Sequence, residues 1–300
     1  MHRKFIWISR RLFYSKLRDT ILDEILNIIN LSGQSLETYK IQHAHRMKLI
    51  NFWDIKNGDR IFEVGCGQGD TTVALAHAIG DKGFVYGIDI ASPDYGSPET
   101  LGQAREKILR SPIGNRIEMH FNFDLLNQQK LPFETNEFDY AVLSHCLWYL
   151  SSYEELVKLL ETARKFCKKL CIAEWNPVIK ISDQIPHYMA VTIQAICESF
   201  APSDFSNVRT LFYPADIKRA VVESGWRIEK SEDVYSDKIQ DGTWEISMVK
   251  DQYKERINEI ASIPQKLKNL LSAQIDELGS VDEIKPMSAF CLIANRNDGG

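Results

Sequence analysis

The chain has 300 residues, of which 44% are hydrophobic and 26% are charged, a composition typical of globular proteins. No apolar run approaches the roughly 18–20 residues needed to span a bilayer, which excludes an integral membrane protein. The net charge of -5 argues against a broad basic face, so we expect no nucleic-acid partner.

The six cysteines do not have the spacing of a disulfide framework, because no C-x-x-C pair occurs. They predict buried free thiols in a reducing compartment, hence a cytoplasmic protein. The basic N-terminus carries an apolar piece at 5–8 that is shorter than the roughly 7–15 residues of a secretory signal. We therefore expect no such signal.

Residues 11–31 have the apolar spacing of a helix, and residues 36–52 are expected to form a second one. From residue 60 onward, short strands alternate with helices. The predicted strands are 60–64, 83–89, 116–122, 138–144, 170–174, 226–235 and 288–295. The predicted helices are 70–79, 97–110, 152–166 and 214–224, with a mainly helical stretch at 243–278.

Two helix starts are predicted from local signals. Ser97-Pro98-Glu99 combines a capping residue, a proline at the first helical position and an acid in the first turn. Ser152 and Glu155 have the spacing of a capping box, in which each side chain binds the other's backbone N–H.

Strands that alternate with helices predict an α/β fold with a parallel sheet covered on both faces. The expected organisation is an N-terminal helical cap at 1–55 and one domain at 56–300. Two segments, 177–213 and 237–285, exceed the minimal alternation. Ligands of open α/β sheets bind beyond the carboxyl ends of the strands, so we expect these insertions to be helical lids there.

The strongest motif runs from Glu63 to Asp70, with Gly65, Gly67 and Gly69 between a predicted strand and a predicted helix. Glycines permit a tight turn and a close approach of backbone amides to a ligand. Asp89 ends the next strand, where a carboxylate can accept both hydroxyls of a ribose. A nucleoside-containing cofactor is therefore indicated.

The spacing of this loop decides against phosphorylated cofactors. A dinucleotide loop has the pattern G-x-G-x-x-G and a phosphate-binding P-loop ends in Gly-Lys-Ser/Thr, but this loop is G-x-G-x-G. Carboxylates at Glu63 and Asp70 would repel a pyrophosphate and attract an ammonium or a sulfonium. A nicotinamide dehydrogenase is therefore a disfavoured alternative.

Three stretches together resemble the core of the class I S-adenosylmethionine-dependent methyltransferases over residues 60–175. They are the glycine loop, the strand Val85–Asp89, and Leu131-Pro132-Phe133 followed by the strand that begins at Phe138. The resemblance implies a Rossmann-like, seven-stranded, mostly parallel sheet with helices on both faces. It also implies a methyltransferase enzyme with S-adenosyl-L-methionine as its cofactor, and it makes 56–300 the methyltransferase domain.

The resemblance further implies roles for individual residues at the cofactor. The three glycines would line its methionine part and ribose edge, and Glu63 would orient the loop or contact the ammonium. Further contacts are implied for Asp89 at the ribose, Ile90 at the adenine, Asp124 and Leu125 at the adenine amine and ring edge, and Ser144 and His145 near the methionine moiety. Asn122 competes with Asp124, because Asp124 lies seven residues before Leu131 where the family has about four.

Methyl transfer requires a nucleophile in line with the methyl group, and a base only when that nucleophile must lose a proton. His145, just past the strand 138–144, is the first candidate for that base. Side chains near the strand ends and in the insertions are candidates for acceptor contacts: Trp148, Tyr149, Trp175, His187, Tyr188 and Trp244. Glu174 and Asn176 could also hydrogen-bond the acceptor. The histidines have no metal-ligand spacing, so we predict no metal.

The acceptor is expected to be a small molecule. Family members that methylate nucleobase or amide nitrogens carry an Asp/Asn-Pro-Pro-Tyr/Phe turn after the fourth strand, and this chain has Ser144-His145-Cys146-Leu147 there. One alternative is a lipid-modifying enzyme that resembles the cyclopropane fatty-acid synthases, with the basic N-terminus in peripheral contact with a membrane. Another is a module that binds the cofactor without turnover. The oligomeric state is not predicted.

Overall fold

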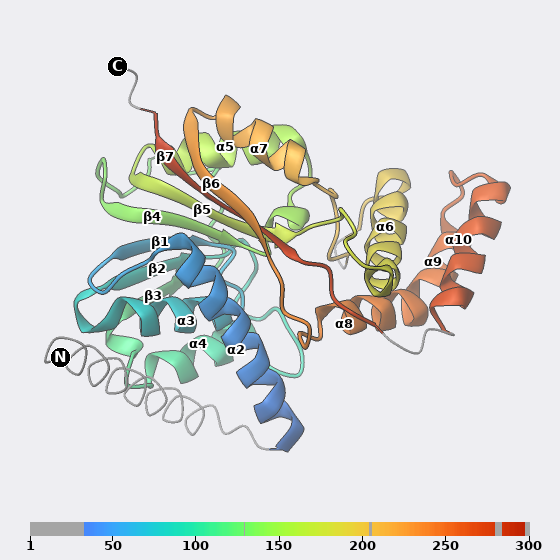
Figure 1. The fold of residues 1–300 in the computed structure, drawn as a ribbon, viewed down its shortest axis with the longest axis horizontal. Coiled ribbons are helices and arrows are strands. Elements are labelled where there is room, and N and C mark those ends of the chain that lie inside the picture. Colours follow the sequence, from blue (N-terminus) through green and yellow to red (C-terminus); the bar gives the residue numbers. More distant parts are fainter. Residues whose placement is uncertain (1–32, 129, 204–205, 280–283, 298–300) are drawn as a thin grey trace, which may run out of the picture. The chain divides into compact units, whose positions relative to one another are not determined.

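The computed structural model describes residues 33–128, 130–203, 206–279 and 284–297. The helix expected at 11–31 and the basic N-terminus lie outside these residues. The chain divides into two compact units, the first ending at Asp124 and the second beginning at Leu125. Figure 1 shows their helices and strands.

The first unit holds three parallel strands in the order β3-β2-β1. They are β1 (Arg60–Val64), β2 (Phe84–Ile88) and β3 (Ile117–His120), and they alternate along the chain with the helices α2 (Gly33–Trp53), α3 (Asp70–Ile79) and α4 (Leu101–Leu109). Ile61 pairs with Val85, and Val85 pairs with Ile117. These side chains are buried, because helices cover strands of a parallel sheet and leave little of them exposed.

The second unit holds four strands in the order β4-β5-β7-β6. They are β4 (Phe138–Ser144), β5 (Cys167–Trp175), β6 (Trp226–Val234) and β7 (Ala289–Arg296). β4 and β5 run parallel, and β7 runs antiparallel to both β5 and β6. The helices α5 (Tyr153–Arg164) and α7 (Pro214–Glu223) lie together beside these strands (Figure 1). The seven strands of the two units confirm the predicted fold class, and the division at residue 55 stays a prediction.

Both helix starts differ in detail from the sequence prediction. The helix α4 begins after Thr100, whose hydroxyl accepts from the Gln103 backbone N–H while the Gln103 side chain accepts from the Thr100 N–H. This reciprocal pair satisfies two otherwise unpaired donors, so the helix begins later than Ser97. At α5, Ser152 caps the Glu155 N–H as predicted, but the Glu155 carboxylate turns to Ser151.

Helices occupy both predicted insertions. The first contains α6 (Ile185–Phe200) and the second contains α8 (Asp241–Met248), a π-helical turn at Val249–Tyr253, α9 (Lys254–Glu259) and α10 (Gln265–Leu278). Their apolar side chains share one buried cluster, so the two insertions fold as one helical layer. None of the described helices is both long and apolar enough to cross a membrane.

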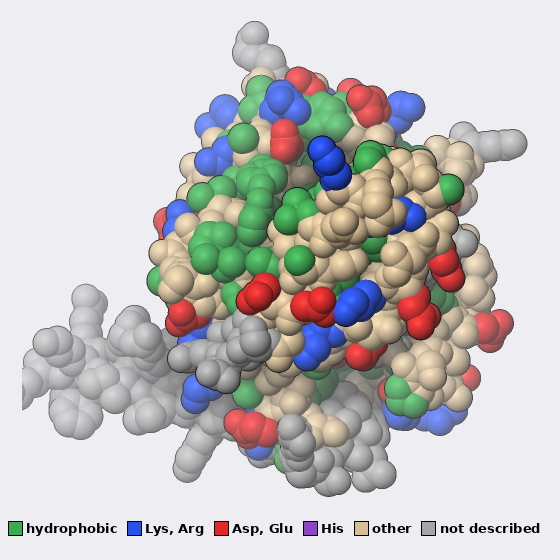
Figure 2. Space-filling view, turned by 90° about the vertical axis from the view of Figure 1, so that its right-hand side faces the viewer, with side chains coloured by type: hydrophobic (Ala, Val, Ile, Leu, Met, Phe, Trp, Pro, Cys, Tyr) green, Lys and Arg blue, Asp and Glu red, His purple; other side chains and the backbone are tan. Residues whose placement is uncertain are grey.

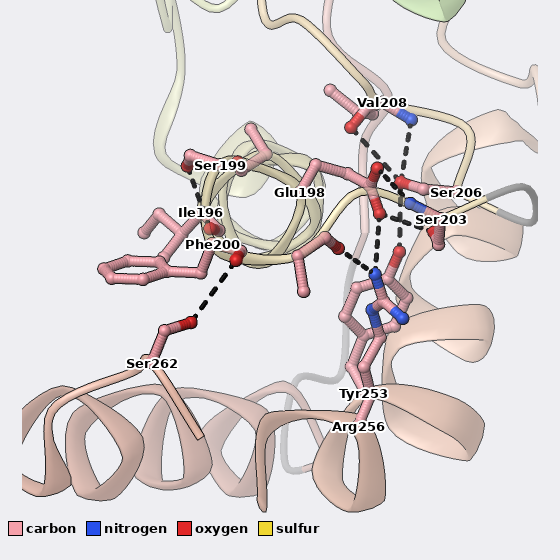
Figure 3. A network of polar contacts seen from close by, with 12 residues as sticks. Ile196, Glu198, Ser199, Phe200, Ser203, Ser206, Val208, Tyr253, Arg256 and Ser262 are labelled. Carbon is pink, nitrogen blue, oxygen red and sulfur yellow. Dashed lines mark hydrogen bonds and ion pairs between the residues drawn. The ribbon is translucent and has the colours of Figure 1, made fainter. Parts of the chain in front are cut away.

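A polar network fastens α6 to α9 (Figure 3). The Glu198 carboxylate accepts from the Ser203 N–H at 2.9 Å and from Arg256 Nη2 at 2.9 Å. Arg256 also donates to the Ala201 carbonyl, and the Tyr253 hydroxyl lies 3.1 Å from Ser206 Oγ. Burying this charge pair is tolerable because both partners make further hydrogen bonds. The network closes the end of the helical layer and holds it in one arrangement.

Candidate functional site

The glycine loop of the first unit uses two of its glycines in opposite ways. Gly67 has φ +49° and Gly69 has φ +89°, a left-handed region that side chains disfavour. A Cβ on Gly67 would meet no atom within 4 Å, whereas a Cβ on Gly69 would collide with the Ile108 side chain. Gly67 thus leaves open space for a ligand, and Gly69 allows α3 to pack closely on the unit's core.

Asp89 ties this loop to the end of β2. Its Oδ2 accepts from the Gly67 N–H at 2.8 Å, and its Oδ1 accepts from the Ala91 N–H at 2.9 Å. A carboxylate has about four lone-pair sites. Asp89 therefore keeps acceptor capacity on each oxygen for the hydroxyls of a ribose, while its orientation is fixed by the backbone.

The turns after β2 and β3 meet beside Asp89. The Asn122 N–H donates to the Ala91 carbonyl at 2.9 Å, and the Phe123 N–H donates to the Asp89 carbonyl at 3.0 Å. Asn122 has φ +53°, and Ile90 is 68% exposed. The structure thus brings Asp89, Ile90 and Asn122 together, and an exposed apolar side chain beside a fixed carboxylate suits a nucleoside. Asp124 is half-buried at the end of the unit.

Glu63 supports the loop from below. It is 1% exposed, and its Oε2 accepts from the Thr72 hydroxyl of α3 at 2.6 Å. Burial raises its pKa to about 8, because desolvation disfavours the charged form. Near neutral pH most Glu63 side chains therefore carry a proton, and the geometry supports orientation of the loop more than attraction of a cationic ligand.

The helix α2 contributes side chains that the sequence motifs did not reveal. Arg46 donates to Thr71 Oγ1 at 3.3 Å and lies 3.5 Å from Asp70 Oδ2, both in the first turn of α3. His43 stacks on His77 of α3 at 5.7 Å between ring centroids. Burial lowers the pKa of His43 to about 4, so its ring is neutral and packs the two helices together.

In the second unit, Ser144 and His145 stand at the carboxyl end of β4. The Ser144 hydroxyl oxygen is buried and has no hydrogen-bond partner among the described residues. His145 has φ +52°, an unusual value for a residue with a side chain, and its N–H donates to the Ala173 carbonyl at 2.8 Å. Backbone conformations of this kind persist where the surroundings enforce them and gather at functional sites.

The His145 ring lies against the end of β5. Its Nδ1 is 3.6 Å from Glu174 Oε1, and its centroid is 4.4 Å from the Trp175 ring at a 35° tilt. The side chain of His145 is 22% exposed, whereas that of Glu174 is 2% exposed. His145 is thus held between a buried carboxylate and an indole while part of its ring stays accessible.

His187, on α6, also contacts Trp175. Its ring contacts Trp175 edge-on at 5.6 Å, and its Nδ1 accepts from the Met287 N–H at 3.0 Å. The proton of the neutral ring is therefore on Nε2, which is buried and has no partner among the described residues. Burial lowers the pKa of His187 to about 3, so the ring is an uncharged donor. We call His145, Trp175 and His187 the ring cluster.

The other predicted acceptor contacts do not belong to the ring cluster. Trp148 is buried, and its Nε1 donates to the Phe212 carbonyl at 3.4 Å. The Tyr149 hydroxyl donates to Asn207, and the Tyr188 hydroxyl lies 3.1 Å from that of Tyr213. Trp244 is exposed on α8.

Glu174 and Asn176, which were candidates for the acceptor, and Leu125, which was a candidate for the adenine, make other contacts in the structure. Glu174 accepts from the backbone N–H groups of 147, 148 and 175. Asn176 donates to Asp233 and accepts from the Val178 N–H. Both side chains are held by hydrogen bonds within the second unit. Leu125 lines a cavity of about 330 Å³ together with Phe133 and Phe166. Among the described residues, no cluster of His, Cys, Asp and Glu could hold a metal ion.

Comparison with known proteins gives the following matches. Residues 61–169 match a family model described as a methyltransferase domain, and residues 7–110 match that of protein-L-isoaspartate(D-aspartate) O-methyltransferase. A cyclopropane-fatty-acyl-phospholipid synthase-like protein of Lactobacillus casei ATCC 334 has a similar structure, with a TM-score of 0.81 and 31% identity over 92% of this chain and 99% of that chain.

Two curated relatives are demethylmenaquinone methyltransferases. That of Shouchella clausii (strain KSM-K16) is 25% identical over 201 residues, which cover 64% of this chain and 80% of the relative. That of Bacillus mycoides (strain KBAB4) is 27% identical over 146 residues, which cover 48% of this chain and 57% of the relative.

Proposed function

Because the chain belongs to the class I S-adenosylmethionine-dependent methyltransferases, we propose that it transfers the methyl group of this cofactor to a small, uncharged, largely apolar acceptor. The observation that carries the proposal is the glycine loop, open above Gly67 and tied to the Asp89 carboxylate. The ring cluster of the second unit supports the choice of acceptor.

The residues of the first unit fit S-adenosyl-L-methionine. Asp89 would hold the ribose hydroxyls, Ile90 would cover the adenine, and the backbone at Gly65 and Gly67 would face the methionine part. When bound, the cofactor supplies a methyl group on an already activated sulfonium centre. In the second unit, the unpartnered Ser144 hydroxyl is a donor suited to the polar methionine moiety.

For the remaining predicted positions we propose the following. Gly69 and Glu63 shape and orient the loop, and Asn122, Asp124 and Leu125 surround the adenine. His145 is the base that takes a proton from the acceptor. Trp175, His187 and Tyr188 contact the acceptor. Trp148, Tyr149 and Trp244 also contact it, but they lie outside the ring cluster.

An uncharged acceptor follows from the chemistry of the ring cluster. The apolar Trp175 ring lies between His145 and His187, and the His187 ring carries one N–H donor without a charge. Such a wall suits an apolar molecule that carries a hydrogen-bond-accepting oxygen. Quinol-like molecules have these properties, and the curated relatives are named demethylmenaquinone methyltransferases.

A lipid acceptor is the second candidate. Val178, Ile181 and Ile185 are exposed at the entrance to the first insertion. Figure 2 shows one face of the molecule on which hydrophobic side chains gather above a zone with more charged ones. The structural relative of Lactobacillus casei is named a cyclopropane-fatty-acyl-phospholipid synthase-like protein.

A turnover screen tests both candidates. The purified protein is incubated with S-adenosyl-L-methionine and either a panel of quinols and phenols or phospholipid vesicles, and S-adenosylhomocysteine is measured. We expect product with the first panel. Product only with vesicles would establish the lipid acceptor, and cofactor binding without product from any acceptor would indicate a non-catalytic module.

We also propose a cytoplasmic location and a helical cap at 1–55. All six cysteines are free thiols, and five of them are buried. Burial raises the pKa of Cys197 to about 11, which keeps that thiol protonated and unreactive. This usage is typical of proteins from reducing compartments.

A further inference from the structure

Glu174 has a geometry that a merely structural carboxylate does not need. It lies at the penultimate position of β5 and is almost completely buried. Its Oε2 accepts from the Leu147 N–H at 2.8 Å and from the Trp148 N–H at 3.4 Å, and its Oε1 accepts from the Trp175 N–H at 2.9 Å. Three backbone donors fix the position of both oxygens.

The oxygen that faces Trp175 also faces His145. Oε1 lies 3.6 Å from His145 Nδ1, within ion-pair distance but beyond a good hydrogen bond. The Nδ1 atom is buried. Catalytic hydrogen bonds are often long before the substrate binds and shorten when it does.

From this geometry we propose that Glu174 is a positioning residue for His145: it holds the proton of the neutral imidazole on Nδ1 and so leaves Nε2 as the proton acceptor toward the methyl acceptor. The proposal rests on the proposed function, because it assigns the atoms of the base at that site. His145 would touch the acceptor, and Glu174 acts only through His145.

The protons and electrons balance in one step. A hydroxyl O–H bond of the acceptor breaks, and its proton forms a bond to His145 Nε2. The electron pair stays on the oxygen, which bonds to the methyl group, and the sulfur keeps the pair of its former bond to that methyl group. The imidazolium that results carries a proton on each nitrogen, faces Glu174 through Nδ1–H, and releases the Nε2 proton to water.

The backbone at His145 supports this arrangement. His145 has φ +52°, and its N–H donates to the Ala173 carbonyl of β5. It begins a turn in which the N–H groups of residues 147 and 148 donate to Glu174. The strained residue and the carboxylate are thus parts of one turn. Stacking on Trp175 then limits rotation of the ring.

The other titratable groups around the pair do not supply the same effect. His187 of α6 is neutral, since burial lowers its pKa to about 3. Glu245 of α8 interacts with the charge of Glu174, but its own carboxylate accepts from Gln194 and Asn207. Among these described side chains, Glu174 is the carboxylate recorded within ion-pair distance of His145.

Nitrogen NMR of the imidazoles tests the proposal without any methyl acceptor. In the wild-type protein with a neutral His145 ring, we expect the Nδ1–H tautomer, and in Glu174→Gln we expect the share of the Nε2–H tautomer to rise, because the carboxylate that accepts from Nδ1–H is lost. His145→Asn identifies the His145 signals by their loss, because asparagine tolerates a positive φ. Glu245→Gln is the matched control and should leave the tautomer of His145 as it is in the wild-type protein, because its carboxylate binds Gln194 and Asn207.

If Glu174→Gln does not fold, the tautomer of His145 in the wild-type spectrum still tests the proposal. A wild-type His145 ring protonated on Nε2, or an unchanged tautomer in a folded Glu174→Gln protein, would overturn the proposal. The NMR result does not depend on the outcome of the turnover screen. Failure of the proposed function can therefore be distinguished from failure of the role proposed for Glu174.

Discussion

The glycine loop of the first unit and the ring cluster of the second unit reach a defined geometry by different means. The loop consists of consecutive residues whose backbone angles and N–H groups make the site, and the Asp89 side chain binds the Gly67 N–H. The cluster consists of side chains from the turn after β4, from β5 and from α6, held by Glu174 and by the Met287 N–H. A backbone site is specified locally, whereas a side-chain site depends on packing between distant segments.

The largest expected effect is a pH dependence of the free energy of unfolding that comes from Glu63. The carboxyl group of Glu63 is buried beneath the glycine loop. Its folded-state pKa of about 8 lies above the ordinary value of 4.5 for an exposed carboxyl. Below pH 4.5 both states are protonated and the stabilisation is complete. Between about pH 4.5 and 8 only the unfolded chain loses its proton, so stability falls by on the order of 4 kcal/mol.

Glu63→Gln removes this titration. Relative to wild type, the variant should gain stability progressively from pH 5 to pH 8, as measured by urea unfolding at each pH. Glu161→Gln, at an exposed carboxylate of α5, should show no such trend. A constant difference between Glu63→Gln and wild type would mean that Glu63 is ionised in the folded protein.

The next largest effect is a difference in stability between alanine substitutions at Gly69 and Gly67 of the same loop. Gly69→Ala must place a Cβ against Ile108 and also accept φ +89°, so we expect a loss of about 3 kcal/mol in the free energy of unfolding. Gly67→Ala has the left-handed angle but open space, and should lose only about 1 kcal/mol. Its larger effect should be on the affinity for S-adenosylhomocysteine, measured by calorimetry. Equal stability losses in the two variants would remove the distinction between a packing glycine and a ligand-facing glycine.

A third test asks whether the loop depends on the Asp89 carboxylate. Asp89→Asn keeps the shape but replaces one acceptor oxygen by a donor, and it should weaken cofactor binding by about 1.5–3 kcal/mol. Asp59→Asn is the control, since Asp59 precedes β1 and caps the Lys56 N–H at the opposite end of that strand. Unchanged calorimetric affinity in a folded Asp89→Asn protein would contradict the ribose assignment.

The same contrast explains what could be predicted from the sequence. The strands, the glycine loop and Asp89 follow from periodicity and local spacing, so an α/β fold and a nucleoside-containing cofactor were predictable. The resemblance of these stretches to the class I methyltransferases then implied S-adenosyl-L-methionine. The start of α4 was not, because the signal at Ser97 competed with the Thr100–Gln103 pair. The contacts of His187 with Trp175 and Met287 were not predictable either, since no local pattern in the sequence encodes which side chains meet across α6, β5 and the segment before β7.

The smallest expected effect probes the side-chain site through one glycine of α8. A Cβ on Gly242 would lie 3.1 Å from His187 Nδ1 and 3.3 Å from its Cβ, tighter than ordinary contact. In Gly242→Ala, the gain of alanine in a helix, up to about 1 kcal/mol, opposes the cost of moving the ring, about 1–3 kcal/mol. We therefore expect a net loss of only about 1 kcal/mol.

The informative readout of Gly242→Ala is the His187 ring. Its Nδ1 accepts from the Met287 N–H, so a displacement of a few tenths of an ångström should lengthen that bond and shift the Nε2–H and Met287 N–H resonances. Ser247→Ala on the exposed side of the same helix should leave both resonances in place while offering a similar gain in helix propensity. Affinity for S-adenosylhomocysteine should be unchanged, because the loop of the first unit is built without α8. If the resonances do not move, or if cofactor affinity falls, the ring cluster is not the independently packed site that distinguishes the second unit from the first.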